Sequence, residues 1–173
     1  NITLGNANDM KKANVGIYVK NSAKKVTNRK NVTVGNNSIG IYGYEISNDS
    51  SDVSVGDNGI GVYSKGSGNV TTSGNITVGK DSIGVYKDGK GTMNIGVASQ
   101  TMTIGEKSYG IYYKGNSVAD SIINSNMNMT LGKEAVGIYG KNTKIDHTGN
   151  ITVGETTIGS DGYSNPDSNK NSI

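Results

Sequence analysis

Tyrosine is the residue of this chain with the clearest potential for binding, because six of its ten copies stand at one position of a repeated motif. These six are Tyr18, Tyr42, Tyr63, Tyr86, Tyr112 and Tyr139. A row of rings presents apolar area edged by hydroxyl groups, and sugar rings or partner side chains pack on such surfaces. We predict a ligand-binding aromatic stripe made of Tyr42, Tyr63, Tyr86, Tyr112 and Tyr139. The simpler alternative is that stacked rings only stabilise neighbouring repeats.

Other residue types give no catalytic or metal site, so the sequence predicts a protein that is not an enzyme and needs no cofactor. His147 is the only histidine and cysteine is absent, which disfavours a zinc site or a catalytic triad. At one corner position acids alternate with lysines, which indicates charge compensation between repeats. This corner column is Asn6, Asn36, Asp57, Lys80, Glu106, Lys133 and Glu155. An acidic pair in a cleft would instead indicate a carbohydrate-active β-helical enzyme.

The tyrosines belong to a two-part repeat that occurs seven times. The first part resembles N-I-T-V-G and stands at 1–5, 31–35, 52–56, 75–79, 101–105, 128–132 and 150–154. The second resembles I-G-I-Y and stands at 15–18, 39–42, 60–63, 83–86, 109–112 and 136–139, with a decayed copy at 158–161. Its glycines are 21 to 27 residues apart. A period of this length is typical of solenoid proteins.

Each part has the alternation of a short β-strand. In N-I-T-V-G, the aliphatic residues face inward and Asn, Thr and Gly face outward. In I-G-I-Y, alternation puts both aliphatic residues inward, so Val15, Ile39, Ile60, Ile83, Tyr109, Val136 and Ile158 are predicted to be buried. Gly and Tyr then share the outer face, with a shallow trough beside the rings. A third, weaker strand is predicted around Val26, Ile46, Val70, Ile95, Ile122 and Ile145.

Three short strands and three corners per repeat predict an all-β parallel β-helix of about seven coils, whose right hand is implied by the family resemblance given below. The β-helix segment covers residues 1–159, with coils that start near 1, 31, 52, 75, 101, 128 and 150, and residues 160–173 form an irregular tail or the start of a further coil. No coil buries its inner face alone, so Val34, Val55 and Val78 must stack on consecutive coils.

Composition agrees with a narrow core. Ile and Val supply 33 residues, Leu appears twice and Phe and Trp are absent, so nearly every aliphatic side chain is β-branched and suited to a strand. An all-α protein is excluded. The net charge of +3 is spread along the chain, which does not favour a nucleic-acid partner. The sequence begins mid-pattern at Asn1 and shows no cap at either end, so we expect both ends to continue into further coils and the fragment to associate end to end.

The paired motifs resemble the passenger repeats of the very large monomeric autotransporter adhesins of fusobacteria and their relatives. The resemblance covers residues 1 to about 159. It implies a bacterial cell-surface protein, anchored by its own outer-membrane barrel, with a right-handed β-helical passenger that attaches to other bacteria or to host cells. Its partners would be host or bacterial surface glycans or proteins. The expected function is therefore a structural and adhesive segment, and the alternatives are a carbohydrate-active enzyme and a non-binding spacer.

Overall fold

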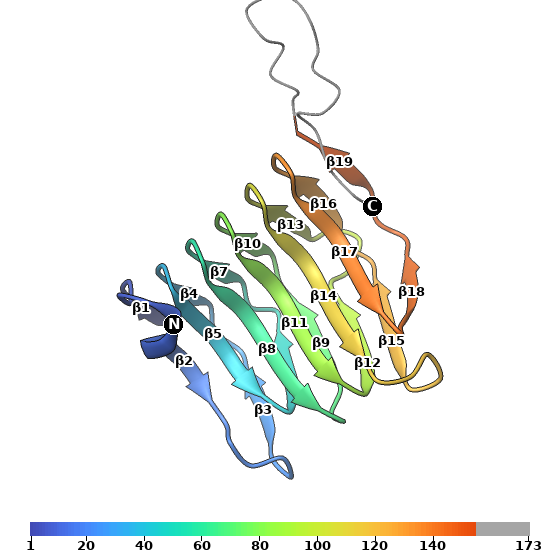
Figure 1. Ribbon diagram of the computed structural model, residues 1–173, viewed down its shortest axis with the longest axis horizontal. Coiled ribbons are helices and arrows are strands. Elements are labelled where there is room, and N and C mark those ends of the chain that lie inside the picture. Colours follow the sequence, from blue (N-terminus) through green and yellow to red (C-terminus); the bar gives the residue numbers. More distant parts are fainter. Residues whose placement is uncertain (155–173) are drawn as a thin grey trace, which may run out of the picture.

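The computed structural model describes residues 1–154, which form a parallel β-solenoid with three strands per coil (Figure 1). Each strand pairs only with its equivalents on neighbouring coils, which gives three parallel sheets. Sheet 1 contains β1 (Ile2–Leu4), β4 (Val32–Val34), β7 (Val53–Val55), β10 (Ile76–Val78), β13 (Thr101–Ile104), β16 (Asn128–Leu131) and β19 (Ile151–Val153). Sheet 2 contains β2 (Asn14–Tyr18), β5 (Ser38–Gly43), β8 (Ile60–Gly66), β11 (Ile83–Gly89), β14 (Tyr109–Gly115) and β17 (Val136–Lys141). Sheet 3 contains β3 (Lys25–Asn28), β6 (Glu45–Asp49), β9 (Val70–Ser73), β12 (Gly91–Ile95), β15 (Ser121–Ser125) and β18 (Lys144–His147).

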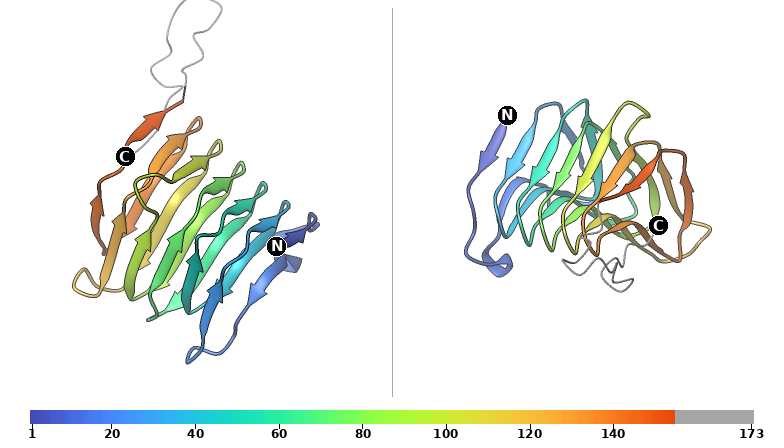
Figure 2. Two further views of the ribbon diagram at one scale, coloured as in Figure 1. Left: turned by 180° about the vertical axis from the view of Figure 1, so that it is seen from behind. Right: turned by 90° about the horizontal axis from the view of Figure 1, so that it is seen from above.

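The strands make six complete coils and the first strand of a seventh, stacked along one axis (Figure 2). Val34 pairs with Val55 and Val55 with Val78, so the predicted in-register stack is confirmed. The hand of the coil stays a prediction. The second motif of the seventh repeat, at 158–161, and the predicted tail at 160–173 lie outside the described residues. An insertion in the first coil forms a short 3-10 helix, η1 (Met10–Lys12), which begins after the N-cap residue Asp9.

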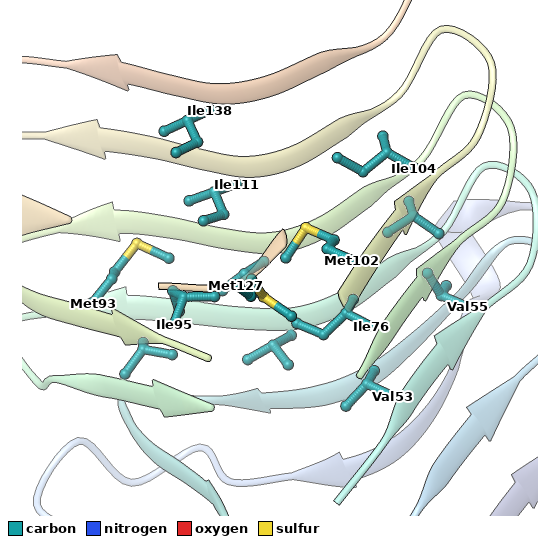
Figure 3. Close-up of a cluster of buried hydrophobic side chains, with 14 of the residues drawn as sticks. Val53, Val55, Ile76, Met93, Ile95, Met102, Ile104, Ile111, Met127 and Ile138 are labelled. Atoms are coloured by element: carbon teal, nitrogen blue, oxygen red, sulfur yellow. The ribbon is translucent and has the colours of Figure 1, made fainter. Parts of the chain in front are cut away.

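The core is a narrow stack of β-branched and Met side chains from all three sheets (Figure 3). The two inward columns of sheet 1 are at most 3% exposed in the middle coils. Their members are Val32, Val53, Ile76, Met102 and Met129, and Val34, Val55, Val78, Ile104 and Leu131. These columns face the buried Ile41, Val62, Val85 and Ile111 of sheet 2. Each coil therefore supplies only a few apolar side chains, and burial depends on the coils above and below.

The predicted alternation of inward and outward residues fails at the glycine of the second motif. The glycines at 40, 61, 84, 110 and 137 are buried, and a Cβ on Gly61 would lie 2.6 Å from the carbonyl oxygen of Gly84 and 3.1 Å from Val53 Cγ1. The glycine therefore faces the core at a close approach of two backbones. The next residue, such as Val62, also faces inward. Two consecutive inward residues shift the preceding aliphatic residue to the outer face.

The predicted inward column at 15, 39, 60, 83, 109 and 136 is therefore wrong. These residues are only partly buried, whereas the residues two positions later in the middle coils are 0% exposed. The predicted trough of glycines beside the tyrosines is wrong for the same reason. Period-two alternation assumes a regular strand, and the close contact between glycine and the neighbouring backbone interrupts that regularity.

The third strand was predicted at the right places but with two register errors. The inward column runs through Val26, Ile46, Val70, Met93, Ile123 and Ile145. Met93 takes the place predicted for Ile95, which is also buried but lies two residues later beside Thr72. Ile123 takes the place predicted for Ile122. Ile145 is 44% exposed although it continues the column.

Polar ladders hold the corners together. The side-chain amide oxygen of Asn36 accepts from the backbone N–H of Asp57, and the carboxylate of Asp57 accepts from that of Lys80. The same relation links Asn31 to the backbone of Asp52, and Asp52 to that of Asn75. Asn and Asp therefore recur because a short side chain satisfies a backbone donor of the next coil. The Asn column is therefore a structural ladder.

Candidate ligand-binding surface

The predicted aromatic stripe forms a continuous row on the outer face of sheet 2. Consecutive rings along Tyr18, Tyr42, Tyr63, Tyr86, Tyr112 and Tyr139 have centroids 5.0, 5.0, 4.8, 5.4 and 4.6 Å apart. The stack of parallel strands sets this spacing, because equivalent residues on neighbouring strands lie about 4.8 Å apart. All five rings proposed as a binding stripe are thus brought together on one side of the solenoid.

The rings cover one another. The two ends are open, with Tyr18 58% and Tyr139 39% exposed, whereas Tyr42, Tyr63, Tyr86 and Tyr112 are half-buried. Tyr112 and Tyr139 stack at an interplanar angle of 28°, and other pairs meet edge to face. Tyr63, Tyr86 and Tyr112, in the middle of the predicted stripe, are therefore not largely exposed. Ring faces in the middle of the row are engaged by neighbouring rings, which leaves edges and hydroxyl groups for a ligand.

A second apolar column flanks the rings where the trough was predicted. It consists of Val15, Ile39, Ile60, Ile83, Tyr109 and Val136, all partly exposed. The Tyr109 ring lies 5.1 Å from that of Tyr112 and 6.2 Å from that of Tyr139, which places Tyr109 on the outer face and adds a further ring to the row. Sequence reasoning missed Tyr109 because strict alternation assigned it to the core.

Burial favours the protonated hydroxyl group in four tyrosines of the row. Burial raises the pKa of Tyr42, Tyr63, Tyr86 and Tyr112, and the Asp88 carboxylate raises the pKa of Tyr63 and Tyr86 further. A phenolate is disfavoured beside other apolar rings because the charged form loses hydration there. At neutral pH the row therefore offers phenol groups that both donate and accept hydrogen bonds.

Charged side chains form a third outer column, two residues beyond the tyrosines on the same strands. The column consists of Lys65, Asp88, Lys114 and Lys141, which are register partners on consecutive coils. The three lysines are exposed and Asp88 is partly buried. The residues between the two columns, such as Ser64 and Tyr113, face the interior. The outer face of sheet 2 thus carries apolar, aromatic and charged columns side by side.

Lys87 is a buried lysine that sequence reasoning did not single out. It follows the tyrosine of its coil, so alternation alone would have assigned it inward. Its ammonium donates to Gly68 O at 2.6 Å and to Ser64 Oγ and Gly66 O at 3.2 Å, and lies 5.8 Å from the centre of the Tyr113 ring. Burial lowers the pKa of Lys87 to about 8. The ammonium binds acceptors of the preceding coil.

The other residues considered as catalytic or metal-binding candidates were the corner charges and His147. The alternation of charges at the corner is partly realised as an ion pair, with Lys80 Nζ 3.6 Å from Glu106 Oε1. Glu155 of that column lies outside the described residues. His147 ends β18 and is the register partner of the buried Ser125. Neither of its ring nitrogens has a hydrogen-bond partner among residues 1–154.

The described part of the chain contains no pocket and no cluster of three or more His, Cys, Asp or Glu residues placed to hold a metal ion. No helix in residues 1–154 has the length and hydrophobicity needed to span a membrane. Any ligand of sheet 2 would therefore bind to an open face rather than in a cavity. Comparison of the chain with protein-family models, with curated proteins and with solved structures gives no match.

Proposed function

We propose that this chain is a structural and adhesive segment of a bacterial cell-surface protein of the autotransporter passenger type. Two features support the proposal: the resemblance of the paired motifs to passenger repeats, and the parallel solenoid into which these motifs fold. A stack of coils extends along one axis and keeps its side chains in fixed columns. Such a rod both spans distance from a surface and displays the same groups repeatedly.

The observation that carries the adhesive role is the unbroken row of tyrosines over six coils. Aromatic side chains are enriched where proteins bind partners, because they bury large areas at little cost in side-chain entropy. Repetition adds to this, because weak contacts on successive coils act together when one ligand spans several of them. The partners in this proposal are glycans or proteins on host or bacterial surfaces.

A second role, that of a spacer, is favoured by the way the rings pack on each other. Half-burial of Tyr63, Tyr86 and Tyr112 means that the row also stabilises the stack of coils. Aromatic pairs of this geometry contribute about 0.5–1.5 kcal/mol beyond their buried area. A row of tyrosines that only stabilised the stack of coils, without binding a ligand, would have the same ring geometry.

The two roles are separated by replacing Tyr63, Tyr86 and Tyr112 with Ser in one variant. The adhesive role predicts that attachment of the purified protein to bacterial and host cells is lost while the fold persists at the assay temperature. The matched control replaces Thr77, Thr103 and Thr130, which form an exposed column on the outer face of sheet 1, with Ala. Unchanged attachment of the tyrosine variant, together with a lower melting temperature, would establish the spacer role.

A further inference from the structure

In the described part of the chain, four ion pairs join neighbouring coils of this solenoid. The register partners Lys25 and Glu45 approach to 3.8 Å, and three further pairs join basic and acidic groups of different coils. These three are Arg29 with Asp49, Lys80 with Glu106, and Lys90 with Asp120. Stacking a charge against its opposite avoids repulsion at the short spacing of a parallel sheet.

The charged column of sheet 2 contains one pair of like charges in register. Lys114 and Lys141 are direct register partners on consecutive coils, and both are exposed. Within residues 1–154 no carboxylate lies within ion-pair distance of either ammonium group. Two like charges opposite each other on a sheet destabilise it. The pair therefore costs stability on the same face, and on the same two strands, as the stacked rings of Tyr112 and Tyr139.

We propose that this face binds a linear acidic polysaccharide, whose carboxylate or sulfate groups lie against Lys114 and Lys141 while its sugar rings lie along Tyr112 and Tyr139. This acidic ligand rests on the proposed adhesive function, to which it adds the chemical class of the partner. The anionic groups neutralise the unpaired ammonium groups. The phenol hydroxyl groups of Tyr112 and Tyr139 meet the hydroxyl-rich edge of the chain.

The repeat distance favours a polysaccharide over other polyanions. The charged and aromatic columns repeat once per coil, at about 4.8 Å. One sugar residue of an extended polysaccharide advances by a comparable length, so successive sugars meet equivalent groups on successive coils. An extended peptide advances by about 3.3 Å per residue and one strand of duplex DNA by about 3.4 Å per nucleotide. Their acidic groups fall out of step with the lysines.

Asp88 limits the length of the site. It lies between Lys65 and Lys114 in the column and is a register partner of both, so the positive charge is interrupted at the fourth coil. An anionic chain aligned with the column meets repulsion at Asp88. Replacing Asp88 with Asn removes that repulsion and joins Lys65 to the other two lysines. The proposal therefore predicts a variant with stronger binding as well as one with weaker binding.

The test measures binding of the whole chain to immobilised polygalacturonate, which carries a carboxylate on every sugar, and to heparin, with dextran as the neutral polysaccharide. Lys114→Gln combined with Lys141→Gln is expected to weaken binding to the acidic chains roughly tenfold, and Lys114→Arg with Lys141→Arg to preserve it. Asp88→Asn is expected to strengthen binding about two- to threefold. The matched control, Lys11→Gln with Lys12→Gln on η1, removes the same charge elsewhere and is expected to leave binding unchanged.

Several results would overturn the proposal. Equal losses in the control and in the Lys114 and Lys141 variant would show attraction by net charge alone. Equal binding of polyglutamate or duplex DNA would show a general polyanion surface. Binding of dextran or of cells that depends on the tyrosines but not on the lysines would reject the acidic ligand and leave the adhesive function standing. Binding of no polysaccharide and of no cell would reject both.

Discussion

Among residues 1–154, Lys87 is the only charged side chain that is fully buried, and its surroundings explain how the fold accommodates it. Three oxygen atoms and one aromatic ring surround the ammonium group, but no carboxylate neutralises it within ion-pair distance in the described residues. Hydrogen bonds to neutral acceptors replace only part of the lost hydration, so the neutral amine is favoured more than in water. The residue links two coils and also makes their stability depend on pH.

The stability of the protein is expected to rise with pH above about 8. The pKa of Lys87 is lowered from 10.5 to about 8, so between these values the folded chain has released a proton that the unfolded chain still holds. Stability therefore increases across this window, by on the order of 3 kcal/mol if fully realised. Above pH 10, Tyr63 and Tyr86 lower the stability of the fold as pH rises, because their pKa values are raised in the folded chain and the unfolded chain loses these protons first.

Urea unfolding between about pH 7.5 and 9.5 measures this slope. In Lys87→Met the slope should be lost, because the buried titrating group is gone. Lys90→Met, which changes an exposed lysine three residues away, should retain it. A slope that persists in Lys87→Met would assign the pH dependence to other groups.

Lys107 occupies a backbone conformation that its side chain disfavours. Five corners each contain one residue in the left-handed backbone region, with φ between 52° and 56°. These residues are Asn37, Asn58, Asp81, Lys107 and Glu134. Asn adopts this region more readily than Lys does. Lys107→Asn is therefore expected to raise the free energy of unfolding by roughly 0.5–1 kcal/mol, measured by urea denaturation. The reverse change, Asn58→Lys, should lower the free energy of unfolding by a similar amount. If neither variant changes the free energy of unfolding, the backbone argument is contradicted.

At the scale of the strand, the second motif determines both what is buried and what is displayed. Glycine and the following aliphatic residue face the core, and the flanking Ile or Val and Tyr face outward. The repeat itself, its register and the row of tyrosines follow from the sequence, because identical residues at one position of a parallel stack must lie in one column. The outward position of Tyr109 and the apolar column in place of the predicted trough do not follow from the sequence. Both depend on a close contact between the motif glycine and a neighbouring backbone, which the alternation of residue types does not reveal.

The third strand shows a second limit. Val26, Ile46 and Val70 were assigned correctly by counting back six or seven residues from the first inward residue of the next coil. In coil four this distance is nine residues, from Met93 to Met102, and in coil five both Ile122 and Ile123 satisfy the count. Ile95 and Ile122 were therefore chosen where the structure uses Met93 and Ile123. A motif repeated without gaps determines its register, whereas a variable loop leaves it to be decided by packing.

A charge placed in an inward column is expected to disrupt the local stack. Val85 is 0% exposed between two coils, so Val85→Asp buries an unpaired carboxylate and should lower stability by about 3 kcal/mol or more. The comparison is Lys65→Asp on the exposed face of the preceding coil, which should change the melting temperature little. Equal effects of the two changes on thermal unfolding would show that the inner and outer faces of sheet 2 are assigned wrongly.

At the scale of the whole molecule, every coil depends on its neighbours. Strands in the middle coils are hydrogen-bonded on both sides, as β11 is to β8 and to β14, and their inward residues are fully buried. In the first coil Ile2, Leu4 and Ile17 are only partly buried. Stability in such an array is a sum of terms for each coil and for each interface, so it is greatest in the middle.

Hydrogen–deuterium exchange is expected to follow this gradient. Amides of β8, β11 and β14 should exchange most slowly, and those of β1 and β2 should exchange faster by at least about tenfold. Mass spectrometry of peptides from each coil measures the order. Uniform exchange across the described coils would mean that the solenoid opens as one cooperative unit, contrary to the nearest-neighbour picture.

Finally, the direction of the hydrogen bonds between coils has a mechanical consequence. These bonds run along the long axis of the rod, from each strand to its equivalent on the next coil. A force that pulls the two ends of the described chain apart along this axis therefore peels each strand from its neighbour one hydrogen bond after another, and the coils yield one at a time. A coil of 21 to 27 residues occupies about 4.8 Å when folded but extends to roughly 70–95 Å when released. If the rod is tethered to a surface as proposed, it lengthens in steps under flow and limits the tension on a bound partner.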